Sequence, residues 1–232
     1  MPRFARNIIS DIPYHIIHRG NNRQKIFFDD RDYEYFLSLL EEARKKYGCR
    51  LYAYVLMPNH FHLLLESSQS SENLAKYIKL LAQKYSQHIN KRHKRTGTLW
   101  EGKFKSSLIS KDNYLLACGR YIEMNPVRAR MVKDPKDYMW SSYRYKVGEA
   151  EGAAPLDPDP LYVDLGKDDN ERQKNYRKWF KESIPPQEWD TIRKAVNKGG
   201  VFGSSHFKER MEKLLGRSLD IRGRGRPKKE KG

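Results

Sequence analysis

Residues 49–66, which read CRLYAYVLMPNHFHLLLE, decide the fold. The segment 49–57 is rich in Tyr, Val and Leu and contains no residue that breaks a strand. Pro58-Asn59 then supplies the fixed φ and the turn tolerance that a tight reversal of the chain requires. The pattern therefore predicts a β-hairpin whose second arm is 60–66.

Two histidines begin this second arm, one residue apart. Because side chains alternate between the faces of a strand, His60 and His62 are predicted to share one face, and Phe61, Leu63 and Leu65 the other. Two imidazoles on one face can hold a divalent cation, with a third ligand and phosphate oxygens completing its coordination. Taken alone, a His-x-His pair on a strand also has a purely structural explanation.

The elements on both sides of the hairpin follow a definite order. Residues 14–19 are predicted to form a strand, and 31–47 an amphipathic helix, because apolar residues recur there every three or four positions. A second helix is predicted after a cap at Ser70 or Ser71, and 99–109 is predicted to be a loop followed by a strand. A third helix is predicted over 111–125.

This order predicts an α+β fold. Strand, helix, strand, strand, helix and strand match a ferredoxin-like split βαβ antiparallel sheet, with two helices on one face. The extra helix over 111–125 is then expected to pack across the other face of the sheet, which would otherwise be open.

The amino-acid composition of the chain changes after residue 147. Gly, Ala, Pro and Asp are frequent over 148–159, and three short helices predicted further on suggest a small accessory bundle. These helices are predicted over 170–182, 186–197 and 204–215. The predicted boundaries are 1–147 for the main domain, 148–166 for a linker, 167–219 for a helical accessory region and 220–232 for a basic tail.

The composition narrows the class of partner. The 232 residues include 46 Lys and Arg against 29 Asp and Glu, and the resulting formal charge of +17 favours a nucleic acid over a membrane. Two cysteines are too few for a disulfide framework or a cysteine-rich zinc site. With no signal-peptide pattern and no apolar run that could span a bilayer, we expect a soluble protein of the cytoplasm.

Basic residues gather in three places that are candidates for DNA contact. The tail 221–229, IRGRGRPKK, resembles an AT-hook that would insert arginines into the minor groove of an A·T-rich duplex, although a solvated basic tail is the alternative. The candidate DNA-binding residues are Lys84, Lys91, Arg92, Lys94 and Arg95 on the second helix and its exit, Lys103, Lys105 and Arg128 further on, and Arg222, Arg224 and Arg226 in the tail.

A tyrosine and an asparagine on the third helix complete a possible reaction site. Tyr121 and Asn125 are four residues apart, so they lie on one face of a helix. Packing that helix across the open sheet face would bring a hydroxyl and an amide oxygen to the metal. A tyrosine beside a metal-bound phosphodiester can attack phosphorus and form a covalent phosphotyrosine. The alternatives are that Tyr121 only packs, and that Asn125 caps a helix restarted by Pro126.

These residues together resemble a known family. The segments Leu56-Met57-Pro58-Asn59-His60-Phe61-His62, 119–129 (GRYIEMNPVRA) and Trp140-Ser141-Ser142-Tyr143 are similar to the HUH-type single-tyrosine transposases, and in particular to the REP-associated tyrosine transposases. The resemblance covers roughly the first two thirds of the chain, and the joint set of motifs is far more specific than any one of them.

The resemblance implies a function. Residues 1–147 would be an HUH-type nuclease domain that binds Mg or Mn through His60, His62 and Asn125. At the position of Asn125, better-studied relatives commonly have glutamine. Tyr121 would cleave single-stranded DNA, leave a 5′-phosphotyrosine and a free 3′-hydroxyl, and then rejoin the strand elsewhere. The substrates would be repeated palindromes that fold into hairpins, and the protein would be a monomer or a homodimer. The competing hypothesis is a non-catalytic regulator that binds hairpin DNA or RNA.

Overall fold

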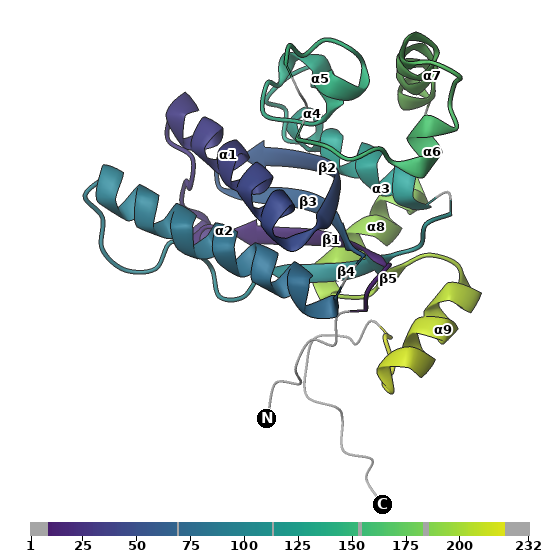
Figure 1. Ribbon diagram of the computed structural model, residues 1–232, viewed down its shortest axis with the longest axis horizontal. Helices are drawn as coiled ribbons and strands as arrows, with labels where there is room; N and C mark the ends of the chain where they lie inside the picture. Colours follow the sequence, from purple (N-terminus) through teal and green to yellow (C-terminus); the bar gives the residue numbers. More distant parts are fainter. Residues whose placement is uncertain (1–8, 69, 113, 153–154, 183–185, 221–232) are drawn as a thin grey trace, which may run out of the picture.

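The computed structural model describes residues 9–68, 70–112, 114–152, 155–182 and 186–220. Their centre is a five-stranded sheet in the order β2-β3-β1-β4-β5 (Figure 1). The strands are β1 (Pro13–Arg19), β2 (Cys49–Met57), β3 (His60–Ser67), β4 (Lys105–Ile109) and β5 (Val201–Phe202). The first four pair antiparallel in the ferredoxin-like order, and β5 adds to β4 in parallel. The predicted α+β class is confirmed.

The β2–β3 hairpin forms where the sequence predicts it. Met57 pairs with His60 across the turn, so Pro58-Asn59 are the only two residues of the connection. The backbone N–H groups of Ile26 and Phe27 donate to the carbonyl of Pro58, at 2.8 and 3.1 Å. The segment after β1 thus fixes the turn that precedes the histidines.

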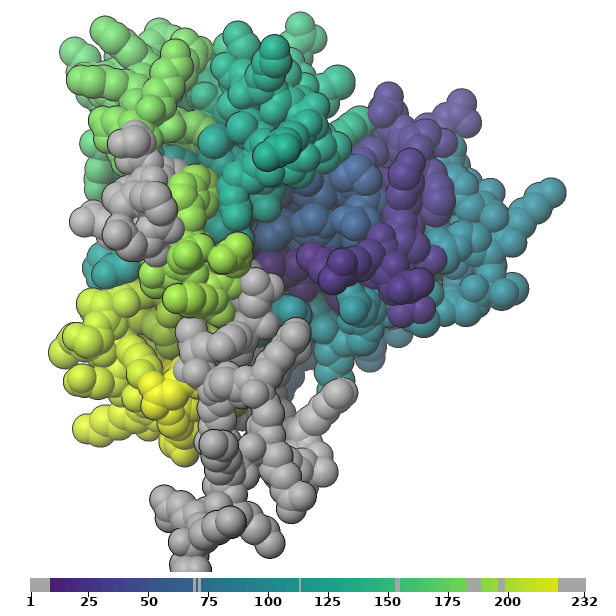
Figure 2. All heavy atoms as spheres, turned by 180° about the vertical axis from the view of Figure 1, so that it is seen from behind, coloured from purple at the N-terminus to yellow at the C-terminus, as the bar shows by residue number. Residues whose placement is uncertain are grey.

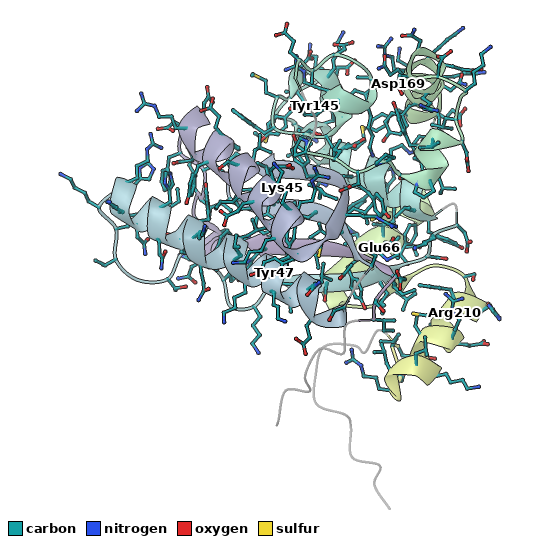
Figure 3. The ribbon with its side chains drawn as sticks, in the orientation of Figure 1. Lys45, Tyr47, Glu66, Tyr145, Asp169 and Arg210 are labelled. Atoms are coloured by element: carbon teal, nitrogen blue, oxygen red, sulfur yellow. The ribbon has the colours of Figure 1, made fainter. Side chains whose placement is uncertain are left out.

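Two long helices cover one face of the sheet. They are α1 (Asp30–Tyr47) and α2 (Ser71–Arg92), and their N-termini are capped by the side chains of Asp29 and Ser70. Gly48 ends α1 in the left-handed conformation, at a φ of 61°. The apolar sides of both helices bury Phe61 and its neighbours on β3, while their polar side chains spread over the outer surface (Figure 3).

The opposite face carries α3 (Tyr114–Glu123) and α4 (Asn125–Arg128), where the sequence suggested one helix over 111–125. Pro126 explains the break, because it has no N–H to donate to the carbonyl of Ile122. The side-chain amide of Asn125 donates to that carbonyl instead, at 3.0 Å, and to the carbonyl of Tyr121 at 2.9 Å.

The Trp140–Tyr143 motif joins α3 to the edge of β2. The N–H of Leu56 donates to the carbonyl of Trp140, and that of Tyr54 donates to the Ser142 hydroxyl. The same hydroxyl donates to the buried carboxylate of Glu123 at 2.6 Å, and Lys146 lies 3.1 Å from that carboxylate. The motif is therefore a structural brace that fixes α3 on the sheet.

The helices after residue 147 form a helical region, as expected, and they pack against the main domain. Helix α7 (Asp169–Lys181) packs on α5 (Tyr143–Lys146) and α6 (Pro160–Val163), whereas α8 (Pro186–Lys198) packs on β4 and β5. Helix α9 (Ser205–Leu215) contributes buried side chains to the same core cluster as α1 and α2. Strand β5 was not predicted. The remaining elements are two short 3₁₀ helices, η1 (Asn21–Arg23) and η2 (Pro135–Asp137).

No helix in the described part of the chain is long and apolar enough to cross a membrane. The proposed division at 148–166 stays a prediction.

Candidate active site

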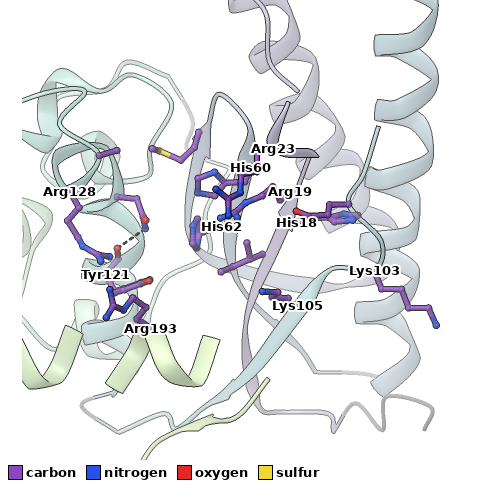
Figure 4. Close-up of a pocket in the computed structure, with 15 residues that line it drawn as sticks. His18, Arg19, Arg23, His60, His62, Lys103, Lys105, Tyr121, Arg128 and Arg193 are labelled. Carbon is purple, nitrogen blue, oxygen red and sulfur yellow. Dashed lines mark hydrogen bonds between the residues drawn. The ribbon is translucent and has the colours of Figure 1, made fainter. Parts of the chain in front are cut away.

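A pocket of about 530 Å³ lies on the sheet face that carries α3 and α8. His60 and His62 line it from β3, and Tyr121 and Asn125 line it from α3 and α4 (Figure 4). Seen from this side, the blue atoms of the β2–β3 region lie recessed between the teal segment that contains α3 and α4 and the purple N-terminal segment (Figure 2). The structure thus brings together the four residues that the sequence singled out.

The two histidines have the orientation that the strand alternation predicts. Their ring centroids are 5.0 Å apart, and Phe61 between them is buried in the core under α1 and α2. His60 Nδ1 lies 2.6 Å from the side-chain oxygen of Asn59. An amide oxygen only accepts hydrogen bonds, so His60 carries its proton on Nδ1 and keeps a lone pair on Nε2.

A third histidine, which sequence reasoning missed, supports His62. His15 Nε2 is 2.8 Å from His62 Nδ1, and both side chains are buried. If His62 donates from Nδ1, its Nε2 is left with a lone pair toward the pocket, and His15 carries its own proton on Nδ1. Ile17 pairs with His62, which places His15 on the same sheet face. The alternation along β1 was therefore a usable signal.

Burial keeps these rings neutral. It lowers the pKa of His15 to about 3 and that of His60 to about 4, and the pKa of His62 lies well below its usual value. The cause in each case is the cost of moving an imidazolium out of water, and Arg19 adds repulsion at His60 and His62. Neutral imidazole is the form that binds a metal ion.

Tyr121 faces the histidines across the pocket. Its ring centroid is 6.3 Å from that of His62 and 5.8 Å from that of His15, and only 5% of the residue is exposed. Asn125 lies one turn further on, and its NH₂ group is taken by the two carbonyls at the end of α3. Since that group faces the carbonyls, the amide oxygen is turned away from them and is free to act as a ligand.

This donor set fits a divalent cation with open coordination positions. Two imidazole nitrogens and one amide oxygen leave room for water and phosphate oxygens, as catalytic metal sites require. Across the described ranges, no group of three or more His, Cys, Asp or Glu side chains could hold a metal ion by itself, so a third ligand for the two histidines has to be a residue of another type, such as Asn125.

The pocket wall is strongly basic. Six of its lining residues are cationic and one, Glu101, is acidic. The cations are Arg19, Arg23, Lys103, Lys105, Arg128 and Arg193. Lys103, Lys105 and Arg128 were candidates from the sequence, whereas Arg19, Arg23 and Arg193 were not.

The other candidate DNA-binding residues lie elsewhere. On the face covered by α1 and α2, Lys84 forms a salt bridge with Glu42 at 2.6 Å. Arg92 forms salt bridges with Asp29 and Asp32 at 2.6 and 2.5 Å. Lys91 and Lys94 are exposed at the exit of α2, while Arg95 donates to Gln24, beside the segment that carries Arg23. Arg222, Arg224 and Arg226 lie outside the described residues.

Fold and pocket together define a ferredoxin-like domain in which a histidine pair faces a tyrosine helix across a basic cavity. The family described as "Transposase IS200 like" matches residues 8–125, just over half of the 232 residues. The chain belongs to the IS200-like transposase family.

Two comparisons agree with the resemblance to REP-associated tyrosine transposases. A Haemophilus influenzae protein described under that name is 28% identical over 138 residues, which cover 53% of this chain and 78% of the relative. A solved structure of such a transposase bound to a REP hairpin matches with a TM-score of 0.55 at 16% identity, over 68% of this chain and 95% of the other. At that identity the structural match speaks for the fold alone. A Deinococcus radiodurans transposase reaches a TM-score of only 0.36 and carries no argument.

Proposed function

We propose that this protein is a metal-dependent single-stranded DNA endonuclease and strand transferase that acts through Tyr121. The observation that carries the proposal is the placement of Tyr121, His60 and His62 around one basic pocket. Membership of a transposase family supports DNA as the substrate. The solved relative bound to a REP hairpin supports hairpin-forming repeated palindromes as the class of DNA.

The chemistry follows from the groups in the pocket. The Tyr121 oxygen attacks phosphorus in line, the new P–O bond forms, and the bond from phosphorus to the 3′-oxygen breaks. The phenol gives up its proton to water, the departing 3′-oxygen takes up a proton from water to become a 3′-hydroxyl, and a 5′-phosphotyrosine remains. Attack by another 3′-hydroxyl reverses the step and joins the strands. A bound Mg or Mn ion would polarise the phosphoryl oxygen. His60, His62 and Asn125 would hold that ion, and Arg19 and Lys105 would bind the phosphate backbone.

Trapping the covalent adduct tests this proposal. A labelled hairpin oligonucleotide incubated with the protein and Mn or Mg should give a complex that survives denaturant. The variant Tyr121→Phe should form none, whereas Tyr114→Phe should react normally, because Tyr114 packs on Phe202 away from the pocket.

An adduct formed equally well by Tyr121→Phe contradicts the assignment. Absence of any adduct, together with tight hairpin binding that does not depend on divalent ions, would favour the non-catalytic regulator. Contact of the tail with an A·T-rich duplex stays a separate prediction.

A further inference from the structure

Helix α8 lies outside the family segment 8–125 and yet contributes Arg193 to the lining of the pocket. Its Ile192 and Ala195 are buried in the same cluster as Tyr121. The hydroxyl of Ser107 on β4 donates to the carbonyl of Ala195 at 3.0 Å, in the interior. The helix is therefore fixed to the sheet on the side where the reaction is proposed to occur, rather than attached at the periphery.

Trp189 of α8 lies beside both Tyr121 and Arg128. The two ring centroids are 5.5 Å apart. The guanidinium of Arg128 lies 5.0 Å from the Tyr121 ring and 4.9 Å from the Trp189 ring. One cation thus contacts both aromatic rings, which is the geometry of a double cation–π interaction.

This contact determines where the Arg128 charge is held. Arg128 is exposed and belongs to α4, a helix of only four residues that gives it little support. A long side chain in such a place has many accessible rotamers, and the face of Trp189 selects one in which the charge stays beside Tyr121. Arg193, one helical turn beyond Trp189, adds a second cation to the same pocket, as Figure 4 shows.

We propose that Trp189 is a positioning residue for the tyrosine nucleophile, and that it acts by holding the Arg128 guanidinium beside Tyr121. The inference rests on the proposed function and extends the reactive site to the C-terminal region. Attack by tyrosine places negative charge on the phenol oxygen and on the phosphoryl group. An arginine does not lose its proton, so Arg128 serves as a fixed positive charge and not as a base.

The test separates this role from simple packing. Single-turnover rates of adduct formation and hairpin dissociation constants are measured for Trp189→Leu and Trp189→Phe. We expect Leu, which has no aromatic face, to lower the rate about tenfold with little change in hairpin affinity, and Phe to retain most of the rate. The effect of Trp189→Leu should vanish in an Arg128→Ala background, because the two residues act as one unit.

Trp179 provides a matched control. The guanidinium of Arg120 lies 4.1 Å from the centroid of the Trp179 ring, outside the pocket. The variant Trp179→Leu therefore removes a similar cation–π contact and should leave the rate of adduct formation unchanged. The proposal is overturned if Trp189→Leu reacts at the normal rate or faster, if hairpin affinity falls in step with the rate, or if the effects of the two pocket variants simply add.

A measurement without DNA keeps the inference separate from the proposed function. The Arg128 side-chain protons, held against two rings, should show ring-current shifts in the NMR spectrum that decrease in Trp189→Leu. Unchanged shifts overturn the positioning role even if no adduct forms. Failure of the wild-type protein to form any adduct, with these shifts behaving as expected, would instead contradict only the proposed reaction.

Discussion

The buried hydrogen bond between His15 and His62 couples the proton positions of the two rings. At 2.8 Å and without solvent, one ring must donate and the other accept. The Nδ1 atom of His15 has no hydrogen-bond partner within the described structure. A buried polar atom left without a partner costs free energy, so the pair is retained at some expense to stability.

We predict that His15 sets the metal affinity of the site. In His15→Leu the acceptor for His62 Nδ1 is lost, and Mn binding should weaken about 10- to 100-fold. In His15→Gln the amide oxygen can replace the acceptor, and most of the affinity should return. Titration calorimetry with Mn alone measures both variants, with circular dichroism to verify folding. Equal affinity of the Leu variant and the wild type would remove His15 from the site.

The short segment between β1 and α1 contributes both to the pocket and to the turn of the β2–β3 hairpin. It carries Arg23 into the pocket and holds the Pro58 turn through Ile26 and Phe27. Gly20 begins it at a close approach of two backbone segments: a Cβ there would lie 2.3 Å from the carbonyl oxygen of Gln24. The constraint is contact, since the φ of Gly20 is −63° and suits any residue.

We predict that Gly20→Ala destabilises the protein by about 1–3 kcal/mol, because the backbone must move to admit one methyl group. Gly119→Ala is the matched control. Its Cβ would make ordinary contacts with Lys146 and Ala53, and alanine favours a helix interior by about 1 kcal/mol over glycine. Urea unfolding measures both. A Gly20→Ala variant as stable as the wild type would show that the backbone of this segment can move to admit the methyl group without a cost in stability.

The C-terminal elements of the molecule share the main sheet and its core to a greater extent than the sequence suggests. Strand β5 extends the main sheet, and Phe207, Met211 and Leu215 of α9 are buried in the cluster that lies under α1 and α2. Residues from the N-terminal and C-terminal thirds of the chain thus share one core, and their stabilities should be coupled.

We predict that Met211→Ala lowers the free energy of unfolding by about 2–5 kcal/mol, in the same transition as β1 to β4. Leu214→Ala on the same helix is the control and should change it by less than about 0.5 kcal/mol, because Leu214 is 62% exposed. Thermal unfolding followed by both circular dichroism and tryptophan fluorescence tests this. Two separate transitions, with Met211→Ala moving only one, would establish an independent C-terminal unit.

The sequence by itself determined the fold class, the hairpin, the two covering helices, the shared face of His60 and His62, and the shared helical face of Tyr121 and Asn125. These features depend on spacing within short segments, where strand alternation and helical periodicity decide the direction of each side chain. The third helix was placed correctly but too long, because Pro126 breaks it and the Asn125 side chain replaces the missing backbone donor.

Only the tertiary structure decided which distant residues complete the site. His15 meets His62 across 47 residues, and Trp189 reaches Tyr121 from a helix that the sequence assigned to an accessory bundle. No local pattern encodes such contacts, because they depend on which exposed apolar face of the sheet each amphipathic helix comes to cover. The hairpin could therefore be found from its own residues, whereas the pocket around its histidines could not.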